Sequence, residues 1–396
     1  MGEWKDVPFH ELFKAPLRNG LNKPSRVRGS GLPMVNMNEI FKYDFIDDTT
    51  PMELVPVTEN ELNTLLVRND LLFARQSLIE SGAGKISIYR GDSEVVFESH
   101  LIRCRIDESL ASALFLYYFF KSPVGRGLMS TIVYQTAAAG IRGSDLMNLE
   151  VPKPPIAEQR AIVSVLSSLD AKIDLLHRQN KTLEAMAETL FRQWFVEEAE
   201  EGWVEVRLGA HVGTNERSLK KDSPLSCIKY LDTGSITKGH IEGLEELAMK
   251  DAPSRARRLV QHNDIVYSTV RPSHCHYGMI KDPPADLVVS TGFCVVTAKT
   301  LGPHFVYYLL TTPDMTEFLH SVAEGSTSTY PSLKPSDIEA VEFQLPPKKR
   351  MEEFEAIAAA NWDKISNNYR QIKSFTALRD TLLPKLMSGE VRVEVQ

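Results

Sequence analysis

The sequence is poor in cysteine and has no long apolar segment. Its 396 residues include only four cysteines, Cys104, Cys227, Cys275 and Cys294, with no CxxC pair. This spacing argues against a disulfide framework or a structural zinc cluster and favours a reducing compartment. The longest apolar run, from Leu110 to Phe120, is too short for a membrane span of roughly 20 residues. The acidic start at Met1–Asp6 lacks the apolar core of an export signal, so we expect a cytoplasmic protein without membrane contacts.

Two short segments resemble nucleotide-binding or base-binding motifs, but each lacks a required residue. A phosphate-binding loop at Ser81–Lys85 would need a glycine in place of Ile79 and a Ser or Thr in place of Ile86. Asp282–Ala285 follows the Asp-Pro-Pro-aromatic pattern of amino-methyltransferases, except that Ala285 offers no ring for a flipped base to stack on. We therefore expect a loop between strands at the first segment and a proline turn at the second.

A metal centre and a catalytic centre are also absent from the sequence patterns. His274 and His276 flank Cys275, and in a strand both imidazoles would lie on one side, as a zinc site could use. Two further ligands would be needed, and no nearby motif supplies them. No Ser/His/Asp, Cys/His or paired-carboxylate pattern is present either. We expect a non-catalytic chain that holds no metal, in which His274 and His276 are polar loop residues that face a ligand or solvent.

The overall charge is mildly acidic. Lys and Arg number 45 against 52 Asp and Glu, which gives a net charge of −7. This balance argues against a protein that coats nucleic acid by bulk electrostatics, because such binding depends on neutralising phosphates. Recognition of DNA by local basic patches, or within a complex whose partner brings positive charge, stays open.

The most informative feature is an internal duplication. Short segments recur in the same order at offsets of 190 to 194 residues, and the drift between these offsets indicates small insertions in loops. Such a period is far longer than that of solenoid repeats, so it indicates two copies of one domain, each followed by a further element. The matching pairs are Asn69–Phe73 with Asn263–Tyr267, Phe115–Tyr118 with Phe305–Tyr308, Ser144-Asp145 with Ser336-Asp337, Pro154-Pro155 with Pro346-Pro347, Lys172-Ile173 with Lys364-Ile365, and Arg178-Gln179 with Arg370-Gln371.

Each copy ends in a long helical pattern. After Pro155, which suits a helix entrance, apolar residues recur in alternating steps of four and three up to Trp194, the spacing of a coiled-coil seam. The second pattern runs from Phe354 to Leu386, is interrupted at Arg379, and ends at Ser388-Gly389. The seam residues that we expect to form the spacer or to bind partners are Ile162, Leu166, Leu169, Ile173, Leu176, Asn180 and Leu183 in the first helix and Ile365, Ile372, Phe375 and Leu382 in the second.

Three asparagines occupy seam positions where an apolar residue would be more stabilising. A buried Asn at such a position fixes helix register and partner choice at a cost in stability. Asn180, Asn361 and Asn368 either have this role or lie on a solvent-facing part of the seam.

Two long helices in one chain allow two arrangements. The 39 residues from Ile156 to Trp194 would form a rod of ~58 Å at ~1.5 Å per residue. The two rods can pair antiparallel within the chain and act as a spacer between two similar domains. Alternatively, they can pair between chains as a dimerisation device.

The globular halves combine short β-rich runs with a helix that carries the Tyr-Tyr motif. The expected runs are bounded by Gly, Pro and Asn, which is typical of strands in an α+β domain. We predict a globular domain over residues 1–155, a helix over 156–199, a second globular domain over 200–346 and a second helix over 347–396. The expected strands are Asp70–Ala74, Lys85–Tyr89, Glu94–Phe97, Asp264–Val270, Leu287–Ser290 and Cys294–Thr297.

Positive charge gathers in a few loops of both halves. Such loops can hold DNA phosphates or direct an Arg towards guanine, or they can simply be solvated. Tyr134-Gln135 and Thr329-Tyr330 lie at matching points before the Ser-Asp motif, where they contact bases or pack. The basic candidates for DNA binding are Arg18, Lys23, Arg26, Arg28 and Arg75 in the first half and Lys220, Lys221, Arg255, Arg257, Arg258 and Arg271 in the second.

Taken together, these segments resemble the DNA-specificity (S) subunits of Type I restriction–modification systems. The resemblance covers essentially the whole chain and is carried by Asn263–Pro272, Ser290–Phe293, Gly325–Pro331 and Leu345–Pro347 in the second copy and by Gly143–Leu146, Val151–Gln159 and Leu169–Ile173 in the first. Two departures stand out. Lys348–Met351 replaces the usual Glu-Gln pair, which Glu158-Gln159 preserves in the first copy, and Asn69 stands where a glycine is more usual.

The resemblance implies a non-catalytic protein with two pseudo-repeated target-recognition domains of mixed α/β type, separated by a pair of long antiparallel coiled-coil helices. Each domain would recognise one half of a split, asymmetric target in double-stranded DNA. The helices would set the gap and dock two methyltransferase (M) subunits, including contacts from Glu158 and Gln159, and restriction (R) subunits would then join. S-adenosylmethionine, ATP and magnesium would be bound by these partners. A self-contained methyltransferase or nuclease, and a coiled-coil scaffold without sequence preference, are the alternatives.

Overall fold

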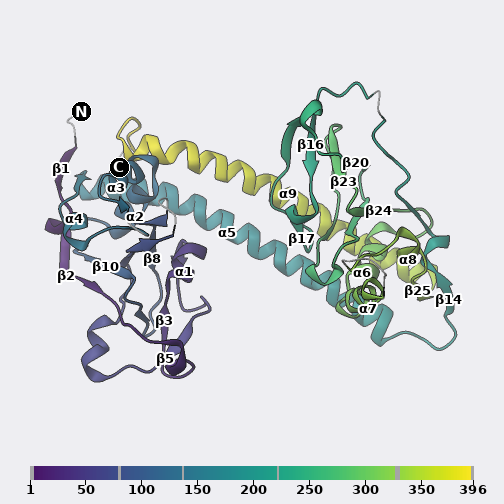
Figure 1. The fold of residues 1–396 in the computed structure, drawn as a ribbon, viewed down its shortest axis with the longest axis horizontal. Coiled ribbons are helices and arrows are strands. Elements are labelled where there is room, and N and C mark those ends of the chain that lie inside the picture. The colour runs from purple at the N-terminus through teal and green to yellow at the C-terminus, as the bar shows by residue number, and fades with distance from the viewer. Residues whose placement is uncertain (1–3, 79–81, 136–137, 221–222, 326–330, 394–396) are drawn as a thin grey trace. The chain divides into compact units, whose positions relative to one another are not determined.

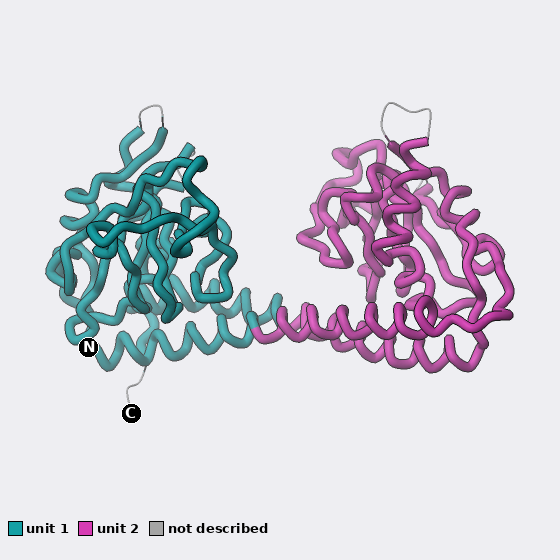
Figure 2. The backbone as a smooth tube through the Cα atoms, turned by 90° about the horizontal axis from the view of Figure 1, so that it is seen from below, with its two compact units in different colours: residues 1–174, 372–396 teal, residues 175–371 magenta. Residues whose placement is uncertain are grey.

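The computed structural model describes residues 4–78, 82–135, 138–220, 223–325 and 331–393. It divides into two compact units, which Figure 2 colours separately. Unit 1 combines residues 1–174 with 372–396, and unit 2 comprises residues 175–371. Each unit contains one globular α/β domain together with a part of both long helices, α5 (Ile156–Arg192) and α9 (Lys348–Met387). This architecture confirms the predicted fold class.

The globular domain of unit 1 is built around a five-stranded sheet with the order β2-β10-β6-β8-β4 (Figure 1). All neighbours are antiparallel except β4 and β8. Helix α2 (Ala113–Lys121) carries the first Tyr-Tyr motif, as the sequence predicts, and it packs on β8. The sheet strands are β2 (Phe13–Asn19), β4 (Phe45–Ile46), β6 (Leu71–Ala74), β8 (Ile86–Tyr89) and β10 (Leu101–Ile106).

Smaller elements complete this domain. A three-stranded sheet, β5-β3-β9, and a second one, β11-β12-β7, flank the main sheet, and β1 pairs with β13 next to the entrance of α5. The strands are β1 (Lys5–Pro8), β3 (Leu32–Val35), β5 (Glu53–Val55), β7 (Gln76–Ser77), β9 (Val96–Phe97), β11 (Tyr134–Gln135), β12 (Ala139–Gly140) and β13 (Glu150–Lys153). The remaining helices are α1 (Met37–Lys42), α3 (Pro123–Ser130) and α4 (Gly143–Met147).

Unit 2 has two four-stranded sheets, ordered β15-β24-β21-β22 and β19-β16-β23-β20. Its strands are β14 (Val204–Arg207), β15 (Val212–Thr214), β16 (Cys227–Leu231), β17 (Ile236–Thr237), β18 (His240–Ile241), β19 (Glu245–Ala248), β20 (Ala256–Leu259), β21 (Ile265–Ser268), β22 (Tyr277–Met279), β23 (Leu287–Ser290), β24 (Phe293–Ala298) and β25 (Glu342–Leu345). The helices are α6 (Pro303–Thr311), which bears the second Tyr-Tyr motif, α7 (Pro313–Glu324) and α8 (Pro335–Glu339).

The Asn-Asp motif that the two copies share is a turn that starts the central strand of each domain. Asn69 and Asn263 have φ angles of 74° and 67°, a backbone conformation that Gly and Asn adopt most readily. This explains why an asparagine replaces the glycine that is more usual in the family. The following Asp closes the turn, since the backbone N–H of Val67 donates to Asp70 Oδ2 at 2.9 Å and that of Gln261 donates to Asp264 Oδ2 at 2.7 Å.

Helices α5 and α9 pair antiparallel in both units. In unit 1, Arg379 Nη1 donates to Asp170 Oδ1 at 2.9 Å. In unit 2, Asn368 Nδ2 donates to Asn180 Oδ1 at 2.8 Å, so residue numbers fall along α9 as they rise along α5. The predicted pairing within one chain is therefore present. Helix α5 continues into a short π-helical turn, Gln193–Glu197, and α9 is followed by Gly389 with a φ of 73°.

The residues of the helix seam differ in burial. Ile162, Leu166, Leu176, Asn180 and Ile365 are buried, whereas Leu169, Ile173, Leu183, Ile372, Phe375 and Leu382 are only partly buried. Ile162 and Leu166 belong to the hydrophobic core of unit 1, and the opposite ends of the helices contribute to the core of unit 2. The apolar residues of the coiled-coil pattern thus pack in two ways. They join the two helices to each other, and at the helix ends they also form part of a domain core.

Candidate nucleic-acid interface

The Tyr-Tyr motif fixes each globular domain to the helix pair and so orients its loops. In unit 1, Tyr118 Oη donates to Asp170 Oδ2 at 2.7 Å, and Asp170 also accepts from Arg379. In unit 2, Trp362 Nε1 donates to Tyr308 Oη at 3.2 Å. Asp170 and Trp362 are 192 positions apart, so equivalent residues make equivalent contacts with different chemistry. At Arg379, where the apolar seam is interrupted, the two helices are therefore joined by the ion pair with Asp170.

In unit 1, three predicted contact residues meet around the small sheet β11-β12-β7. Tyr134 and Gln135 form β11, and Arg75 directly precedes β7 and accepts a hydrogen bond at its backbone oxygen from Ile141 N at 2.9 Å. The guanidinium of Arg142, which sequence analysis missed, lies 5.2 Å from the centre of the Tyr134 ring. Its position just before the Gly143-Ser-Asp motif was the available signal. This cluster offers a ring, an amide and two guanidinium groups to a ligand.

The matching loop of unit 2 has the same backbone frame and different side chains. Leu333 N donates to Thr269 O at 2.8 Å, which makes Thr269 the equivalent of Arg75, and Arg271 therefore lies two residues further along. Arg271 and His274 are exposed, and Arg271 has a φ of 48°. Thr329 and Tyr330 lie outside the described residues. The two domains thus present unlike residues from like positions.

His274 and His276 lie outside the strands, which agrees with the expectation of polar loop residues and not with the strand arrangement that a zinc site could use. Pro272–His274 form a 3-10 turn, Cys275 has a φ of 57°, and β22 starts only at Tyr277. His276 Nδ1 lies 2.7 Å from the backbone oxygen of Ile236. Among the described residues, no three His, Cys, Asp or Glu side chains come together as metal ligands would.

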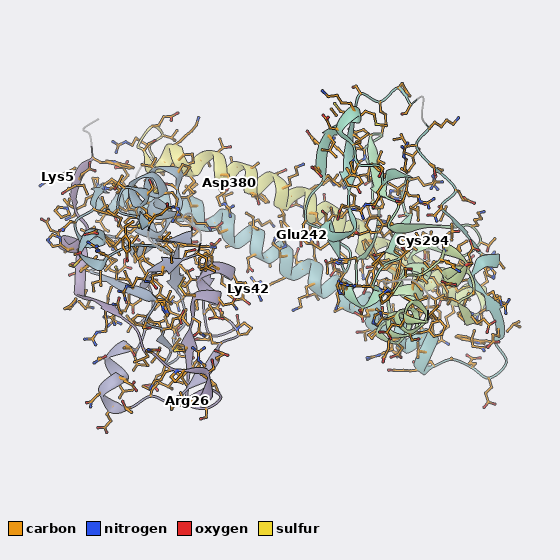
Figure 3. The ribbon with its side chains drawn as sticks, in the orientation of Figure 1. Lys5, Arg26, Lys42, Glu242, Cys294 and Asp380 are labelled. Atoms are coloured by element: carbon orange, nitrogen blue, oxygen red, sulfur yellow. The ribbon has the colours of Figure 1, made fainter. Side chains whose placement is uncertain are left out.

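The N-terminal basic cluster divides into engaged and exposed residues. Lys23 is 13% exposed and pairs with Glu61 at 2.8 Å, and Lys23 together with the N–H of Thr58 lowers the pKa of Glu61 to about 2. Arg28 pairs with Glu53 and donates to Lys23 O at 3.0 Å, so both side chains serve the domain's own structure. Arg18 and Arg26 are exposed, and Arg26 lies at the edge of unit 1 farthest from its helices (Figure 3).

The basic residues of unit 2 show a similar division. Lys220 and Arg255 are exposed, whereas Arg257 and Arg258 are only partly exposed and lie within strand β20. Arg257 Nε donates to Ser254 O at 3.3 Å. Lys221 lies outside the described residues. Lys220, Arg255 and Arg271 are thus the predicted basic residues of this unit that reach furthest into solvent.

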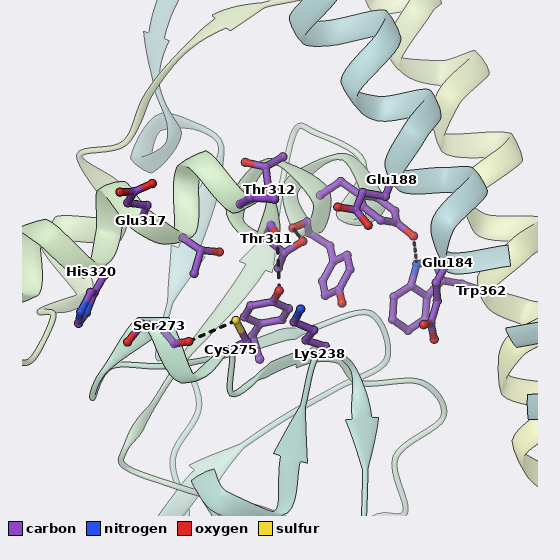
Figure 4. Close-up of a pocket in the computed structure, with 15 residues that line it drawn as sticks. Glu184, Glu188, Lys238, Ser273, Cys275, Thr311, Thr312, Glu317, His320 and Trp362 are labelled. Carbon is purple, nitrogen blue, oxygen red and sulfur yellow. Dashed lines mark hydrogen bonds between the residues drawn. The ribbon is translucent and has the colours of Figure 1, made fainter. Parts of the chain in front are cut away.

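Unit 2 also contains a cavity of about 400 Å³ between α5, α6, α7 and the loop at Cys275 (Figure 4). Glu184 and Glu188 project into it from α5, and Trp362 and Tyr307 line its wall. Burial raises the pKa of Glu184. The carboxylates make this cavity suited to a cationic group and unsuited to a DNA phosphate, so it is not part of the candidate interface.

The predicted partner contacts Glu158 and Gln159 are instead buried inside unit 1. Gln159 Nε2 donates to Pro154 O and its Oε1 accepts from Ser112 N, both at 2.8 Å, which ties the start of α5 to the start of α2. Glu158 accepts from Trp4 Nε1 at 3.2 Å and pairs with Arg392 at 2.7 Å. Both side chains therefore have a structural role within unit 1.

The fold and these loops define a protein with two globular domains. The domains share a similar backbone and present different basic and aromatic side chains from it. Residues 1–185 match the family model described as the Type I restriction modification DNA specificity domain. The chain is 29% identical over 307 residues to the MjaIX specificity subunit of Methanocaldococcus jannaschii, which covers 71% of this chain and 69% of the relative. It is 23% identical over 385 residues to the MjaVIII specificity subunit of the same organism, with coverages of 89% and 85%.

A solved structure shows the same fold. The S subunit of a Type I restriction-modification system from M. genitalium is 16% identical, covers 97% of this chain and 96% of its own, and superimposes with a TM-score of 0.61. In sequence and in fold, the chain is therefore similar to the DNA-specificity subunits of Type I restriction–modification systems. The matched family model is described as a DNA specificity domain, and both relatives are named as specificity subunits. In the described part of this chain, no helix is both long and apolar enough to cross a membrane.

Proposed function

We propose that this chain gives a Type I restriction–modification complex its sequence specificity, with each globular domain recognising one half of a two-part, asymmetric target in double-stranded DNA. One observation carries the proposal. The domains share the Asn-Asp turn and the Tyr-Tyr anchor, yet their loops differ at matching positions, as at Arg75 and Thr269. A common frame with different contact residues is what recognition of two different half-sites requires.

The DNA contacts that we propose come from residues of the candidate interface that are at least partly exposed. Arg75, Tyr134, Gln135 and Arg142 would serve one half-site, and Arg271 and His274 the other, with Arg18, Arg26, Lys220 and Arg255 as phosphate contacts. Lys23 and Arg28 are withdrawn from this set because acidic neighbours already engage them. With a net charge of −7, few phosphate contacts are available to the chain by itself, which fits recognition within a larger complex.

The helices would set the spacing and dock two methyltransferase subunits, which restriction subunits then join. Exposed apolar side chains on the helix pair support this role, since large exposed hydrophobic groups are typical of interaction surfaces. In unit 2, Met186 of α5 is 56% exposed and Ile357 of α9 is 43% exposed, and both line one groove along the pair. S-adenosylmethionine, ATP and magnesium would be held by the partner subunits.

A domain exchange tests the proposal. Residues 200–346 are replaced by the corresponding domain of a relative with a known target, and the complex with methyltransferase subunits is assayed by sequencing the methylated sites. We expect one half-site to change and the other to stay, and exchange of residues 1–155 should give the reverse. A change in both halves would contradict one domain per half-site. Methylation that is indifferent to either exchange would favour a scaffold without sequence preference.

A further inference from the structure

Each unit has an ion pair beside a tryptophan at its end of the helix pair, which we call the latch. The acidic and basic residues of the latch are exchanged between the two units. In unit 1, Arg392 Nη1 donates to both carboxylate oxygens of Glu158, at 2.7 and 3.0 Å. The Arg392 guanidinium also lies 4.7 Å from the centre of the Trp4 ring, which precedes β1. The two charged side chains are 12% and 22% exposed, so water screens this pair only in part.

In unit 2, the equivalent positions also form an ion pair, but the acidic and the basic residue have exchanged places. An offset of 192 residues (350 less 158, and 392 less 200) matches Glu158 with Arg350 and Arg392 with Glu200. Arg350 pairs with Glu198 and lies 3.6 Å from Glu200. Its guanidinium lies 6.0 Å from the centre of the ring of Trp203, which precedes β14 as Trp4 precedes β1. The Lys348–Met351 departure from the family pattern therefore has a structural counterpart in Glu198 and Glu200.

The interior of the helix pair has the same asymmetry. Asn180 and Asn368 are buried and hydrogen-bonded to each other. Their equivalents at the 192-residue offset are Ile372 and Leu176. A pair of two α5 helices in the same register would place Asn180 opposite Leu176 and leave the amide without its partner. It would also place Glu158 opposite Glu200 of the other copy.

We infer that the pairing faces of α5 and α9 fit each other and reject a second copy of themselves. Two α9 helices would bring Arg350 to Arg392 and Asn368 to Ile372, so both like-with-like pairs are penalised by repulsion and by an unpaired buried amide. Only the pairing of α5 with α9 brings Glu158 to Arg392 and Asn180 to Asn368. The pairing face of each long helix therefore selects the helix of the other repeat as its partner. As a result, the two helices pair within one chain although the two repeats are similar. This inference is independent of the DNA recognition proposed above.

Charge reversal in the full-length chain tests the latch. Glu158→Arg and Arg392→Glu alone should each lower Tm by about 4 °C, because like charges then meet at a partly buried site. The double variant restores opposite charges and should return Tm to near the wild-type value. Glu353→Arg, which reverses an exposed charge on α9, is the matched control and should leave Tm nearly unchanged. A double variant that melts as low as the single variants would overturn the charge assignment.

Partner choice needs a second pair of variants, both carrying Asn180→Leu and Asn368→Leu. One adds Glu158→Arg with Arg350→Glu, which makes each helix complementary to its own copy and repulsive to the other repeat. The other adds Glu158→Arg with Arg392→Glu, which has the same net charge and keeps α5 complementary to α9. Light scattering should show the first variant doubling from the chain mass of 44.5 kDa while the second stays monomeric. If both remain monomeric, or both dimerise, these residues do not select the partner and the inference fails.

Discussion

At the scale of single residues, the strongest repeat motif is structural and not a DNA contact. Asp70 and Asp264 are buried, and each forms an ion pair with an arginine from another segment of its domain. Arg105 donates to both carboxylate oxygens of Asp70 at 2.8 Å. Arg217, from a different segment, donates to Oδ2 of Asp264, whose Oδ1 accepts from Thr297 Oγ1 at 2.7 Å. The aspartate persists in both copies because it closes the turn before the central strand, and its cationic partner is supplied in two different ways.

The Asp70→Ala variant should therefore unfold more easily. It leaves Arg105 without its partner and the Val67 N–H without its acceptor, which costs about 3 kcal/mol, the lower end of the range for a broken buried pair because Arg105 is partly exposed. For a unit of this size the corresponding fall in Tm is roughly 6–12 °C, measurable by circular dichroism. The control is Asp92→Ala, which removes a 76% exposed carboxylate paired with Arg68. A similar loss in both variants would show that Asp70 is not a special site.

At the scale of elements, the Tyr-Tyr helices explain how one frame accommodates two chemistries. In the first copy, Asp170 of α5 pairs with Arg379 of α9. At the equivalent positions of the second copy, Trp362 of α9 and Ala187 of α5 belong to one hydrophobic cluster. A charged pair and a large-and-small apolar pair thus fill the same position between the helices.

Transplanting the apolar pair into unit 1 tests this equivalence. Arg379→Ala alone should lower the free energy of unfolding by about 1–2 kcal/mol, because it leaves the partly buried Asp170 with fewer partners. Adding Asp170→Trp copies the unit 2 pair and should recover most of this loss, as a buried ion pair can be replaced by apolar groups of suitable shape. Chemical denaturation provides the measurement. Additive losses in the double variant would mean that the two units pack their helices differently.

The sequence predicted elements better than it predicted contacts. The repeat offsets located both central strands and both Tyr-Tyr helices, since strand and helix periodicities depend on local patterning. It could not show that Lys23 and Arg28 are engaged, because Glu61 and Glu53 approach them only through the fold. Arg142 was missed for the same reason, as its contact with Tyr134 depends on pairing between β11 and β12. Charge clusters in a sequence do not distinguish an ion pair from a free phosphate ligand.

At the scale of the whole molecule, the proposed spacing role depends on two helices that must change length together. In unit 1 the pair Asp170–Arg379, and in unit 2 the pair Asn180–Asn368, joins α5 to α9, and Glu158 of α5 also pairs with Arg392, which follows α9. Lengthening only one helix would therefore break the contacts on one side of the insertion. Lengthening both by one heptad keeps the seam on the same face, because seven residues nearly complete two turns.

We expect a heptad inserted after Asp174 in α5 and after Ser374 in α9 to widen the gap between the two half-sites. Each insertion adds ~10.5 Å of helix, which corresponds to about 3 base pairs at ~3.4 Å each. Sequencing of the methylated sites of the reconstituted complex would show unchanged half-site sequences separated by the longer gap. The control is a heptad inserted in α5 alone, which should abolish methylation or stability instead of moving the half-sites. An unchanged gap in the double insertion would mean that the methyltransferase subunits, and not these helices, set the spacing.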